Sequence, residues 1–169
     1  VNEAHFRHVM ETLSFPDGSV FVDIGCGKGK PLLLAATFPF VEQAIGVEFG
    51  GALCTIARRN AIRYARRRNL SAEIRVEHTD ALCYDIAPNH NIFFINNPFD
   101  AELFAALVER IAMSSRQSPR TIWILYGNPE HEAVLHRHPQ FQRQARFRFF
   151  GPGRDIAVYR SVPWGPRQA

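Results

Sequence analysis

Three glycines at every second position lie between two apolar runs near the start of the chain. The stretch reads VFVDIGCGKGKPLLLAA, Val20 to Ala36, and a carboxylate, Asp23, stands two residues before the first glycine. Glycine tolerates positive φ and leaves no Cβ in the way of an approaching ligand. A bare turn of this kind between a strand and a helix therefore indicates that a small molecule binds close to the backbone.

The spacing of the glycines separates the ligands that use such a turn. A phosphate-binding P-loop needs four residues between its first glycine and a Gly-Lys-Ser/Thr end, and no such pattern occurs here. The dinucleotide fingerprint G-x-G-x-x-G needs a third glycine at the position of Lys30. The remaining pattern is D-x-G-x-G-x-G, which disfavours NAD.

Two further carboxylates follow later apolar segments. Glu48 lies in IGVEFGG at the end of the second predicted strand, and Asp80 lies in HTDAL after the third. A carboxylate only accepts hydrogen bonds and can take two hydroxyl donors at once, which suits Glu48 to a ribose. Asp23 and Asp80 each have a structural alternative, because a lone aspartate often caps a helix or stabilises a turn.

Apolar patterning gives the elements that must position these residues. Helices are predicted at 2–13, 31–36, 51–67 and 101–113, and strands at 20–24, 44–49, 74–78, 92–95 and 121–126. Intervening helices make the strands parallel. Residues 143–150 and 156–161 flank a Gly-Pro-Gly turn and predict an antiparallel hairpin. The predicted fold class is therefore α/β, a doubly wound, mostly parallel seven-strand sheet with a C-terminal antiparallel hairpin and helices on both faces.

The glycine turn, Glu48, Asp80 and the terminal hairpin together resemble the class I, seven-strand S-adenosylmethionine-dependent methyltransferases. The resemblance covers residues 20 to about 160. It implies that S-adenosylmethionine is the cofactor and that Asp23 orients its ammonium group. It also implies that the cofactor's amino-acid part lies against the backbone of Gly25, Cys26, Gly27 and Gly29.

The same resemblance places the rest of the cofactor on the neighbouring strand ends. Glu48 is expected to accept hydrogen bonds from both ribose hydroxyls, and Phe49 to border the adenine. Asp80 is expected to receive the adenine amino group, and the backbone N–H of Ala81 to meet a ring nitrogen.

The loop after the fourth predicted strand, Asn96-Asn97-Pro98-Phe99, is the predicted catalytic segment. It resembles the Asp/Asn-Pro-Pro-aromatic motif of methyltransferases that modify planar nitrogens, but it is one residue short or has Asn97 in place of a proline. Methyl transfer depends mainly on alignment, so Asn97, Pro98 and Phe99 are predicted to hold an acceptor amine by hydrogen bonds and stacking. The alternative is an Asn-Pro turn that ends the strand, with Phe99 in the core.

The predicted acceptor is a nitrogen of a protein side chain or a small molecule. A nucleic acid is the less favoured acceptor, because the chain has no separate base-recognition domain. A catalytically inactive module that binds cofactor or a partner is a further alternative. An NAD-dependent oxidoreductase is disfavoured, since the chain lacks a Tyr-x-x-x-Lys pair. A second loop, residues 126–131, either lines the acceptor pocket or begins a helix over 133–136.

Six arginines between Arg58 and Arg68 crowd into one predicted helix, in a chain of net charge +4. They either follow phosphates or an acidic partner, or form the solvated face of a helix whose apolar side packs in the core. The sequence leaves both interpretations open.

Composition limits the remaining possibilities. The chain has 169 residues, 46% of them hydrophobic, and is predicted to be one domain over 1–169, with an N-terminal helix in 1–16 and a Rossmann-like core in 20–161. No window approaches the roughly 18 uninterrupted apolar residues of a membrane span, so we expect a cytoplasmic protein with no membrane partner. Three cysteines without a CxxC pair, and histidines without ligand-like spacing, predict neither disulfides nor a bound metal.

Overall fold

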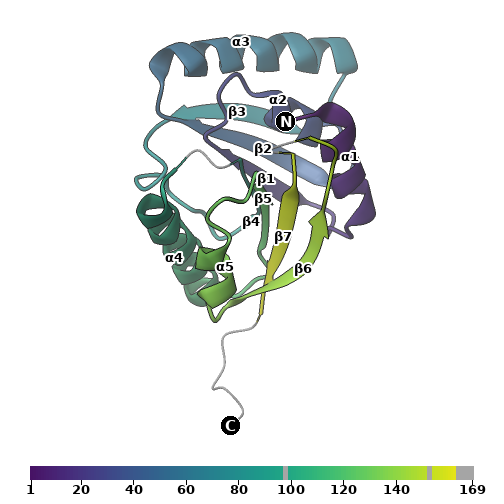
Figure 1. Cartoon of the computed structure of the whole chain (residues 1–169). Coiled ribbons are helices and arrows are strands. Elements are labelled where there is room, and N and C mark those ends of the chain that lie inside the picture. Colours follow the sequence, from purple (N-terminus) through teal and green to yellow (C-terminus); the bar gives the residue numbers. More distant parts are fainter. Residues whose placement is uncertain (97–98, 152–153, 163–169) are drawn as a thin grey trace.

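The computed structural model describes residues 1–96, 99–151 and 154–162, and Figure 1 shows the arrangement of the chain. The strands are β1 Ser19–Ile24, β2 Val41–Glu48, β3 Glu73–His78, β4 His90–Ile95, β5 Trp123–Gly127, β6 Phe141–Phe147 and β7 Ile156–Ser161. The helices are α1 Glu3–Thr12, α2 Lys30–Ala35, α3 Gly51–Arg68, α4 Ala101–Gln117 and α5 Ala133–Arg137.

The strands form one seven-stranded sheet in the order β3-β2-β1-β4-β5-β7-β6. β1 to β5 are parallel, and β7 pairs antiparallel with both β5 and β6. The predicted fold class is thereby confirmed. The direction of strand order reverses between β1 and β4, which lie side by side, and ligands of open α/β sheets bind beyond the carboxyl ends of the strands at such a point.

Helices cover the two faces of the sheet (Figure 1). A separate apolar cluster is buried on each face. Residues of α1, α2 and α3 pack on one face, with Phe21 and Phe94 of the sheet. Residues of α4 and α5 pack on the other face, with Phe93 and Tyr126. All six residues of β1 are buried because helices cover both of its sides, which explains its almost continuous apolar run.

Helix α1 is fixed at its start by a cap and along its length by aromatic packing. Asn2 Oδ1 accepts the backbone N–H groups of Ala4 and His5 at 2.9 and 3.3 Å. The Phe6 ring meets Phe21 and Phe94 edge-on, at centroid distances of 5.8 and 5.4 Å. The predicted helix within residues 1–16 therefore begins at Glu3 and lies firmly on the sheet.

Several predicted boundaries differ from the structure by a few residues; for example, β2 begins at Val41 rather than at residue 44. α4 continues to Gln117 rather than ending at Met113, because Ser114 and Ser115 are buried and hydrogen-bonded instead of ending the helix. β6 ends at Phe147 rather than at residue 150. Beyond it the chain leaves the sheet, and Phe149 stacks on His5 of α1 with a centroid distance of 3.8 Å. The end of the hairpin is therefore attached to the N-terminal helix.

Arg120 holds together the amino edge of the sheet. Its guanidinium donates to the carbonyl oxygens of Ala87, His90, Ser114 and Ser118, at 2.8 to 3.3 Å, and to the Ser114 hydroxyl at 2.8 Å. One side chain thus satisfies carbonyls from the end of α4 and the start of β4. Burial lowers the pKa of this group from its ordinary value.

In the described residues, none of the helices has the length and apolar character that a membrane-spanning helix needs.

Replacing Arg120 with methionine should destabilise the fold by about 3 kcal/mol, since a buried hydrogen-bond partner that is left unpaired costs about 1–3 kcal/mol. Urea denaturation followed by circular dichroism would measure the change. Arg137→Met, on the exposed side of α5, is the matched control. Equal stability of the two variants would show that the Arg120 contacts do not stabilise the fold.

Candidate functional site

The glycine turn after β1 has the left-handed backbone that its sequence predicts. Gly25, Gly27 and Gly29 have φ of 74°, 55° and 84°. A Cβ placed on Gly27 would meet no atom within 4 Å, so this part of the turn faces open space. A Cβ on Gly29 would lie 3.5 Å from the Cβ of Ala57, so the turn packs closely against α3. The backbone at Gly27 is therefore accessible to a ligand.

Glu48 ties this turn to the next element. Its Oε2 accepts the backbone N–H of Gly27 at 2.9 Å, and its Oε1 accepts that of Gly50 at 2.8 Å. The side chain thus points to the glycine turn from the end of β2 and also anchors the start of α3. Each carboxylate oxygen has two lone pairs, so each can accept one further donor, such as a ribose hydroxyl.

Cys26 contributes to the turn through its backbone, with its side chain directed into the protein. Its N–H donates to the Val47 carbonyl at 3.0 Å, and its carbonyl accepts the N–H of Gly29 at 2.8 Å. A Cβ on Gly46 of β2 would lie 2.7 Å from Cys26 Sγ, so only glycine leaves room for the thiol. Burial raises the pKa of the Cys26 thiol, which keeps it protonated. Its part in cofactor binding stays a prediction.

Asp23 is a buried carboxyl group with one oxygen that no protein group satisfies. Its residue is 2% exposed, and its Oδ2 is buried without a hydrogen-bond partner. Burial raises the pKa of Asp23 to about 7, against the opposing effect of a hydrogen bond from the backbone of Leu32. The negative charge of Glu48 adds to the increase. An unsatisfied buried oxygen in a native fold indicates a missing partner.

The remaining predicted adenosine contacts lie on the ends of β2 and β3. The Phe49 side chain is 75% exposed, so it is accessible to a ligand. Asp80 Oδ1 accepts the backbone N–H of Leu82 at 2.7 Å, which is the turn-stabilising role that the sequence left open. Ala81 is buried against the α4 side of the sheet. Whether Asp80 also binds adenine stays a prediction.

The predicted catalytic loop is described only in part, because Asn97 and Pro98 lie outside the described residues. Phe99 is half-buried and packs against the apolar cluster under α4, as the core alternative expects. Asn96 is exposed at the end of β4. A Cβ on Gly127 would overlap the Asn96 amide oxygen, so the glycine at the end of β5 leaves room for this side chain.

A polar pocket of about 440 Å³ lies beside Asn96 and the glycine turn. It is formed by four parts of the chain: the start of α1, the start of α2, the end of β4 and the entry to β7. Its lining residues are Val1, Asn2, His5, Lys30, Asn96, Arg154, Asp155 and Ile156. The lining thus contains two cationic side chains, Lys30 and Arg154, and one carboxylate, Asp155. It also contains the imidazole of His5.

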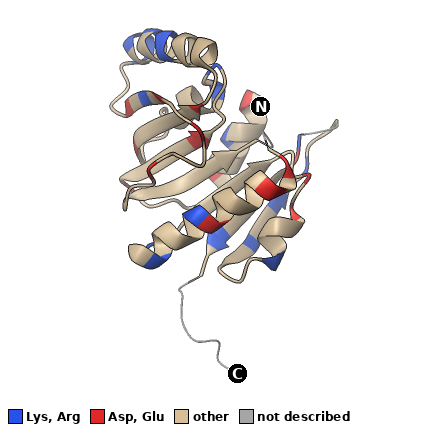
Figure 2. Cartoon of the chain, turned by 90° about the vertical axis from the view of Figure 1, so that its left-hand side faces the viewer, with Lys and Arg blue, Asp and Glu red and all other residues tan. Residues whose placement is uncertain are grey.

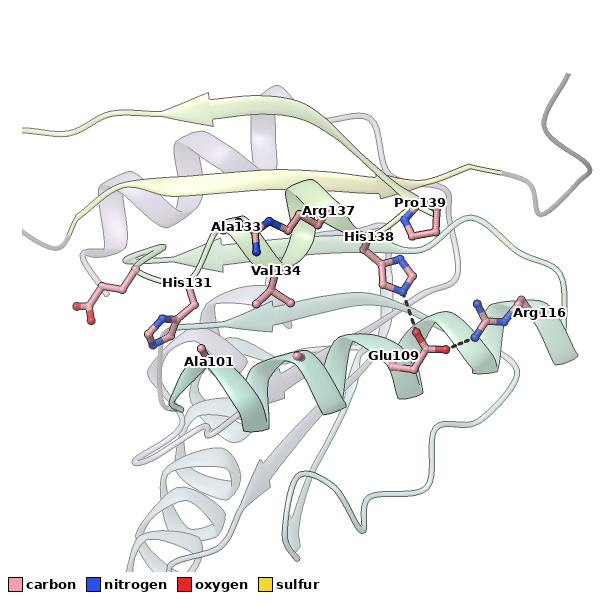
Figure 3. A pocket seen from close by; sticks show the side chains of 11 residues that line it. Ala101, Glu109, Arg116, His131, Ala133, Val134, Arg137, His138 and Pro139 are labelled. Atoms are coloured by element: carbon pink, nitrogen blue, oxygen red, sulfur yellow. Dashed lines mark hydrogen bonds and ion pairs between the residues drawn. The ribbon is translucent and has the colours of Figure 1, made fainter. Parts of the chain in front are cut away.

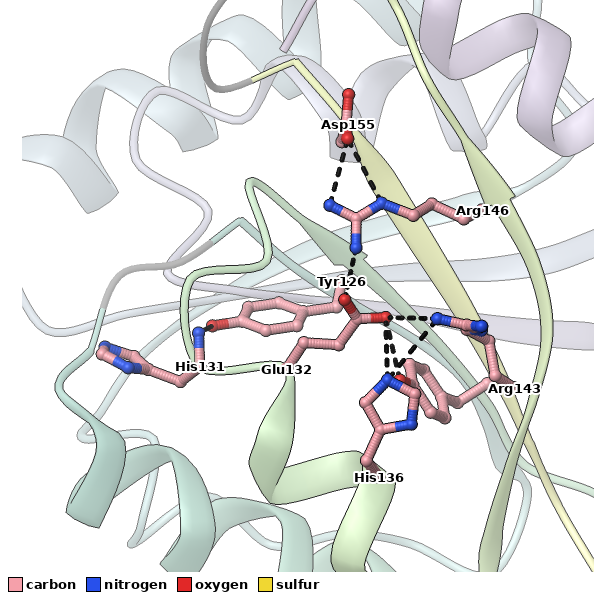
Figure 4. A network of polar contacts seen from close by, with 8 residues as sticks. Tyr126, His131, Glu132, His136, Arg143, Arg146 and Asp155 are labelled. Carbon is pink, nitrogen blue, oxygen red and sulfur yellow. Dashed lines mark hydrogen bonds and ion pairs between the residues drawn. The ribbon is translucent and has the colours of Figure 1, made fainter.

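The carboxylate of Asp155 belongs to a network of polar contacts that extends to β6 and the start of α5 (Figure 4). Arg146 on β6 donates to Asp155 Oδ2 from Nε and Nη2 at 3.2 and 3.1 Å. The same guanidinium contacts Glu132, which also accepts the Tyr159 hydroxyl at 2.9 Å and lies 3.6 Å from Arg143. Because Arg146 neutralises Asp155, the charge that the pocket offers to a ligand is positive.

The second loop that the sequence singled out faces a different hollow. Glu130 and His131 line a groove of about 770 Å³ between α4 and α5, together with Ala101, Val134 and other residues (Figure 3). Tyr126 is buried, and its hydroxyl accepts the His131 N–H at 3.2 Å. The loop thus leads into α5, as the helix-start interpretation predicts, and these residues are not among those lining the polar pocket.

Lys30, Arg154 and His5 are site residues that sequence reasoning missed. They come from segments more than 20 residues apart, and only the position of β7 next to β5 brings them to one edge of the sheet. No local motif marks them. In the part of the chain that the structure describes, no group of three or more His, Cys, Asp or Glu residues could hold a metal ion.

The family model "Histone methylation protein DOT1" matches residues 1–123 of the chain. The chain belongs to the DOT1 family of histone methylation proteins. This membership decides between the methyltransferase and the oxidoreductase interpretations: the protein is an S-adenosylmethionine-dependent methyltransferase. A comparison with curated proteins finds no match.

The names of solved structures with this fold indicate that these proteins act on different methyl acceptors. An RNA methyltransferase from Salinibacter ruber in complex with S-adenosyl-L-homocysteine superposes with a TM-score of 0.69 at 15% identity, over 100% of this DOT1-family chain and 97% of that one. The B. subtilis M1A22 tRNA methyltransferase TrmK gives 0.64 at 16% identity, over 94% and 65%. The mitomycin 7-O-methyltransferase MmcR gives 0.68 at 14% identity, over 95% and 54%. The fold therefore does not determine the acceptor.

The residues at the switch point of this DOT1-family protein fit S-adenosylmethionine. Asp23 offers a buried, unsatisfied carboxylate oxygen to an ammonium group. Gly27 leaves an open backbone beside it, and Glu48 brings acceptor oxygens to the same turn. The assignment of individual residues to parts of the cofactor stays a prediction.

Asp23→Asn should stabilise the cofactor-free protein at neutral pH and weaken cofactor binding. Folded Asp23 keeps its proton up to about pH 7, whereas an unfolded aspartate loses it near 3.8. The folded state therefore loses stability as pH rises between these values, and the asparagine variant does not. We expect a gain on the order of 3 kcal/mol at pH 8, and none at pH 4, in urea denaturation. Asp17→Asn, in an exposed turn, is the control. Loss of stability at pH 8 would contradict the assignment.

S-adenosylhomocysteine, but not NAD, should raise the melting temperature of the protein. At 100 times its dissociation constant a ligand adds about 2.7 kcal/mol, which corresponds to roughly 5–10 °C for a chain of this size. Glu48→Ala should remove most of this increase, because the carboxylate is lost from the glycine turn. Differential scanning calorimetry measures both effects, with Glu42→Ala, at a surface position of β2, as the control. An increase with NAD instead would overturn the cofactor site.

Proposed function

We propose that this methyltransferase acts on a nitrogen of RNA. The observation that carries the proposal is the charge of the polar pocket beside the glycine turn. Lys30 and Arg154 line it, and its single carboxylate, Asp155, is neutralised by Arg146. A pocket of this charge favours an acceptor that carries phosphate.

The surface next to this pocket offers a stacking partner for a base. Phe150 lies in the connection between β6 and β7, and its side chain is 98% exposed. Arg148, two residues before it, is also exposed. The Arg154 guanidinium lies close to Gly151, because a Cβ there would be 3.2 Å from Arg154 Nε. An exposed aromatic ring between arginines is the combination that single-stranded nucleic acids bind by stacking and by phosphate contacts.

The chemistry of a nitrogen acceptor asks little of the protein beyond alignment. When bound, S-adenosylmethionine supplies a methyl group on a positively charged sulfur, and the lone pair of the acceptor nitrogen takes this group as the neutral thioether leaves. The amide of Asn96 at the end of β4 lines the pocket and can accept a hydrogen bond from an acceptor amine. That bond would orient the lone pair of the amine, which is the main source of catalysis in such a reaction.

A protein lysine is the second candidate acceptor, because the family model names histone methylation. A lysine ammonium, however, would approach Lys30 and Arg154 in a pocket whose carboxylate already has an arginine partner. Like charges at short range disfavour that arrangement. The RNA methyltransferase names of the Salinibacter and B. subtilis structures support the first candidate.

Purified protein should transfer labelled methyl groups from S-adenosylmethionine to RNA and not to a histone. Mass spectrometry of the digested RNA should find the label on a nitrogen of a base. Transfer to the histone alone would establish the second candidate and overturn the first.

Lys30→Ala and Arg154→Ala should each lower kcat/KM on RNA by at least about tenfold, since each removes a contact to phosphate. The increase in melting temperature with S-adenosylhomocysteine should remain, which separates loss of acceptor binding from loss of cofactor binding. Arg137→Ala on α5 is the control. Unchanged kcat/KM in both pocket variants would overturn the assignment of this pocket to the acceptor.

A further inference from the structure

Four arginines form a continuous stripe along the exposed side of α3. Arg59, Arg63, Arg66 and Arg67 are separated by four, three and one residues, and all four are exposed. At 3.6 residues per turn these positions fall within an arc of about 100° on the helix. We call them the arginine stripe. In Figure 2, α3 carries blue segments and no red ones, since residues 51–68 contain no Asp or Glu.

The arginine stripe has no carboxylate partner in the described residues. None of its members is in an ion pair. Several other surface arginines of this chain do pair, namely Arg7 with Glu3, Arg75 with Glu77, and Arg146 with Asp155 and Glu132. The stripe is distinguished by four neighbouring arginines on a helix that has no acidic residue to balance them.

The stripe costs stability in the absence of a partner. Arg63 is four residues from both Arg59 and Arg67 and three from Arg66, and like charges at these spacings destabilise a helix. The negative end of the helix dipole favours Arg66 and Arg67 in the last turn, but not Arg59 and Arg63. Repulsion that the fold does not relieve points to an anion that is bound from outside.

The arginine stripe begins beside the glycine turn. Asn60, on the same side of α3, donates from Nδ2 to the Lys28 carbonyl of the glycine turn at 3.0 Å. Arg63 and Arg67 line a hollow of about 270 Å³ with Asn60, Tyr64 and Leu33 of α2. Lys28 and Lys30 are exposed at the near end of this path. A chain of phosphates could thus run from the polar pocket past the lysines to the arginine stripe.

We propose that the arginine stripe binds the phosphate backbone of the RNA whose nitrogen is methylated, outside the acceptor pocket. Arg59 and Arg67 are separated by about 12 Å along the helix axis, which is the length of a few nucleotides. The buried side of α3 packs on the sheet through Cys54, Ala57 and Ala61. Ile62 is the one large hydrophobic side chain exposed on α3, so the helix offers no continuous apolar face to a lipid surface. This inference rests on the proposed function for the identity of the strand, but its test is separate.

Binding of a labelled 20-nucleotide single-stranded RNA, followed by fluorescence anisotropy at several salt concentrations, tests the proposal. The double variant Arg63→Gln/Arg67→Gln should bind at least about tenfold more weakly at 0.1 M salt than wild type. Its slope of log affinity against log salt should be shallower by about 1.4, as expected for two lost contacts to a single strand. The double variant Arg75→Gln/Arg137→Gln has the same net charge and should bind like wild type.

The stripe variant should unfold at the same or a slightly higher temperature than wild type, because it removes like-charge repulsion from α3. Its binding of S-adenosylhomocysteine should be unchanged, because neither Arg63 nor Arg67 donates a hydrogen bond to the glycine turn. Equal RNA affinity of the two double variants would overturn the proposal, as would tighter binding of poly-glutamate than of RNA. RNA that binds through the stripe but receives no methyl group would support this inference and refute the proposed function. If RNA is methylated but the stripe variant binds it as tightly as wild type, the proposed function is supported and this inference is refuted.

Discussion

The site depends on one carboxylate that bridges two backbone N–H groups. Glu48, at the end of β2, accepts hydrogen bonds from two backbone N–H groups, that of Gly27 in the turn after β1 and that of Gly50 at the start of α3. Two elements that are far apart in the sequence are thereby fixed to the same strand end. The glycine turn and the start of α3 are thus held beside each other. Glu48 is therefore a structural residue of the fold as well as a predicted ligand of ribose.

Much of the fold could be predicted because its signals are local. The D-x-G-x-G-x-G turn, the apolar strands and the Gly-Pro-Gly hairpin each occupy a short stretch, and they gave the parallel sheet and its antiparallel end. Boundaries were less predictable: Ser114 and Ser115 extend α4 because distant groups satisfy them. The direction of the Cys26 side chain likewise depends on Gly46, twenty residues away, which carries no signal of its own.

The candidate site also has a part that could be predicted from the sequence and a part that could not. Asp23, the glycines and Glu48 come together because parallel strands place their carboxyl ends at one edge, and that rule can be applied to a sequence. The acceptor side could not be predicted, because it combines His5, Lys30 and Arg154. These residues meet only because β7 runs antiparallel beside β5 and the hairpin end stacks on α1. For the arginines of α3, composition left two interpretations open, and only the positions of the acids favour one of them.

The unsatisfied oxygen of Asp23 has a consequence for the lifetime of the protein in a cell. A fold that keeps such a group in its interior is less stable alone than with the ligand that completes it, and the difference grows with the ligand concentration. Molecules without ligand open more often and are the ones that proteases degrade. On our prediction that the methyl donor completes this site, its supply would raise the abundance of this enzyme as well as its rate.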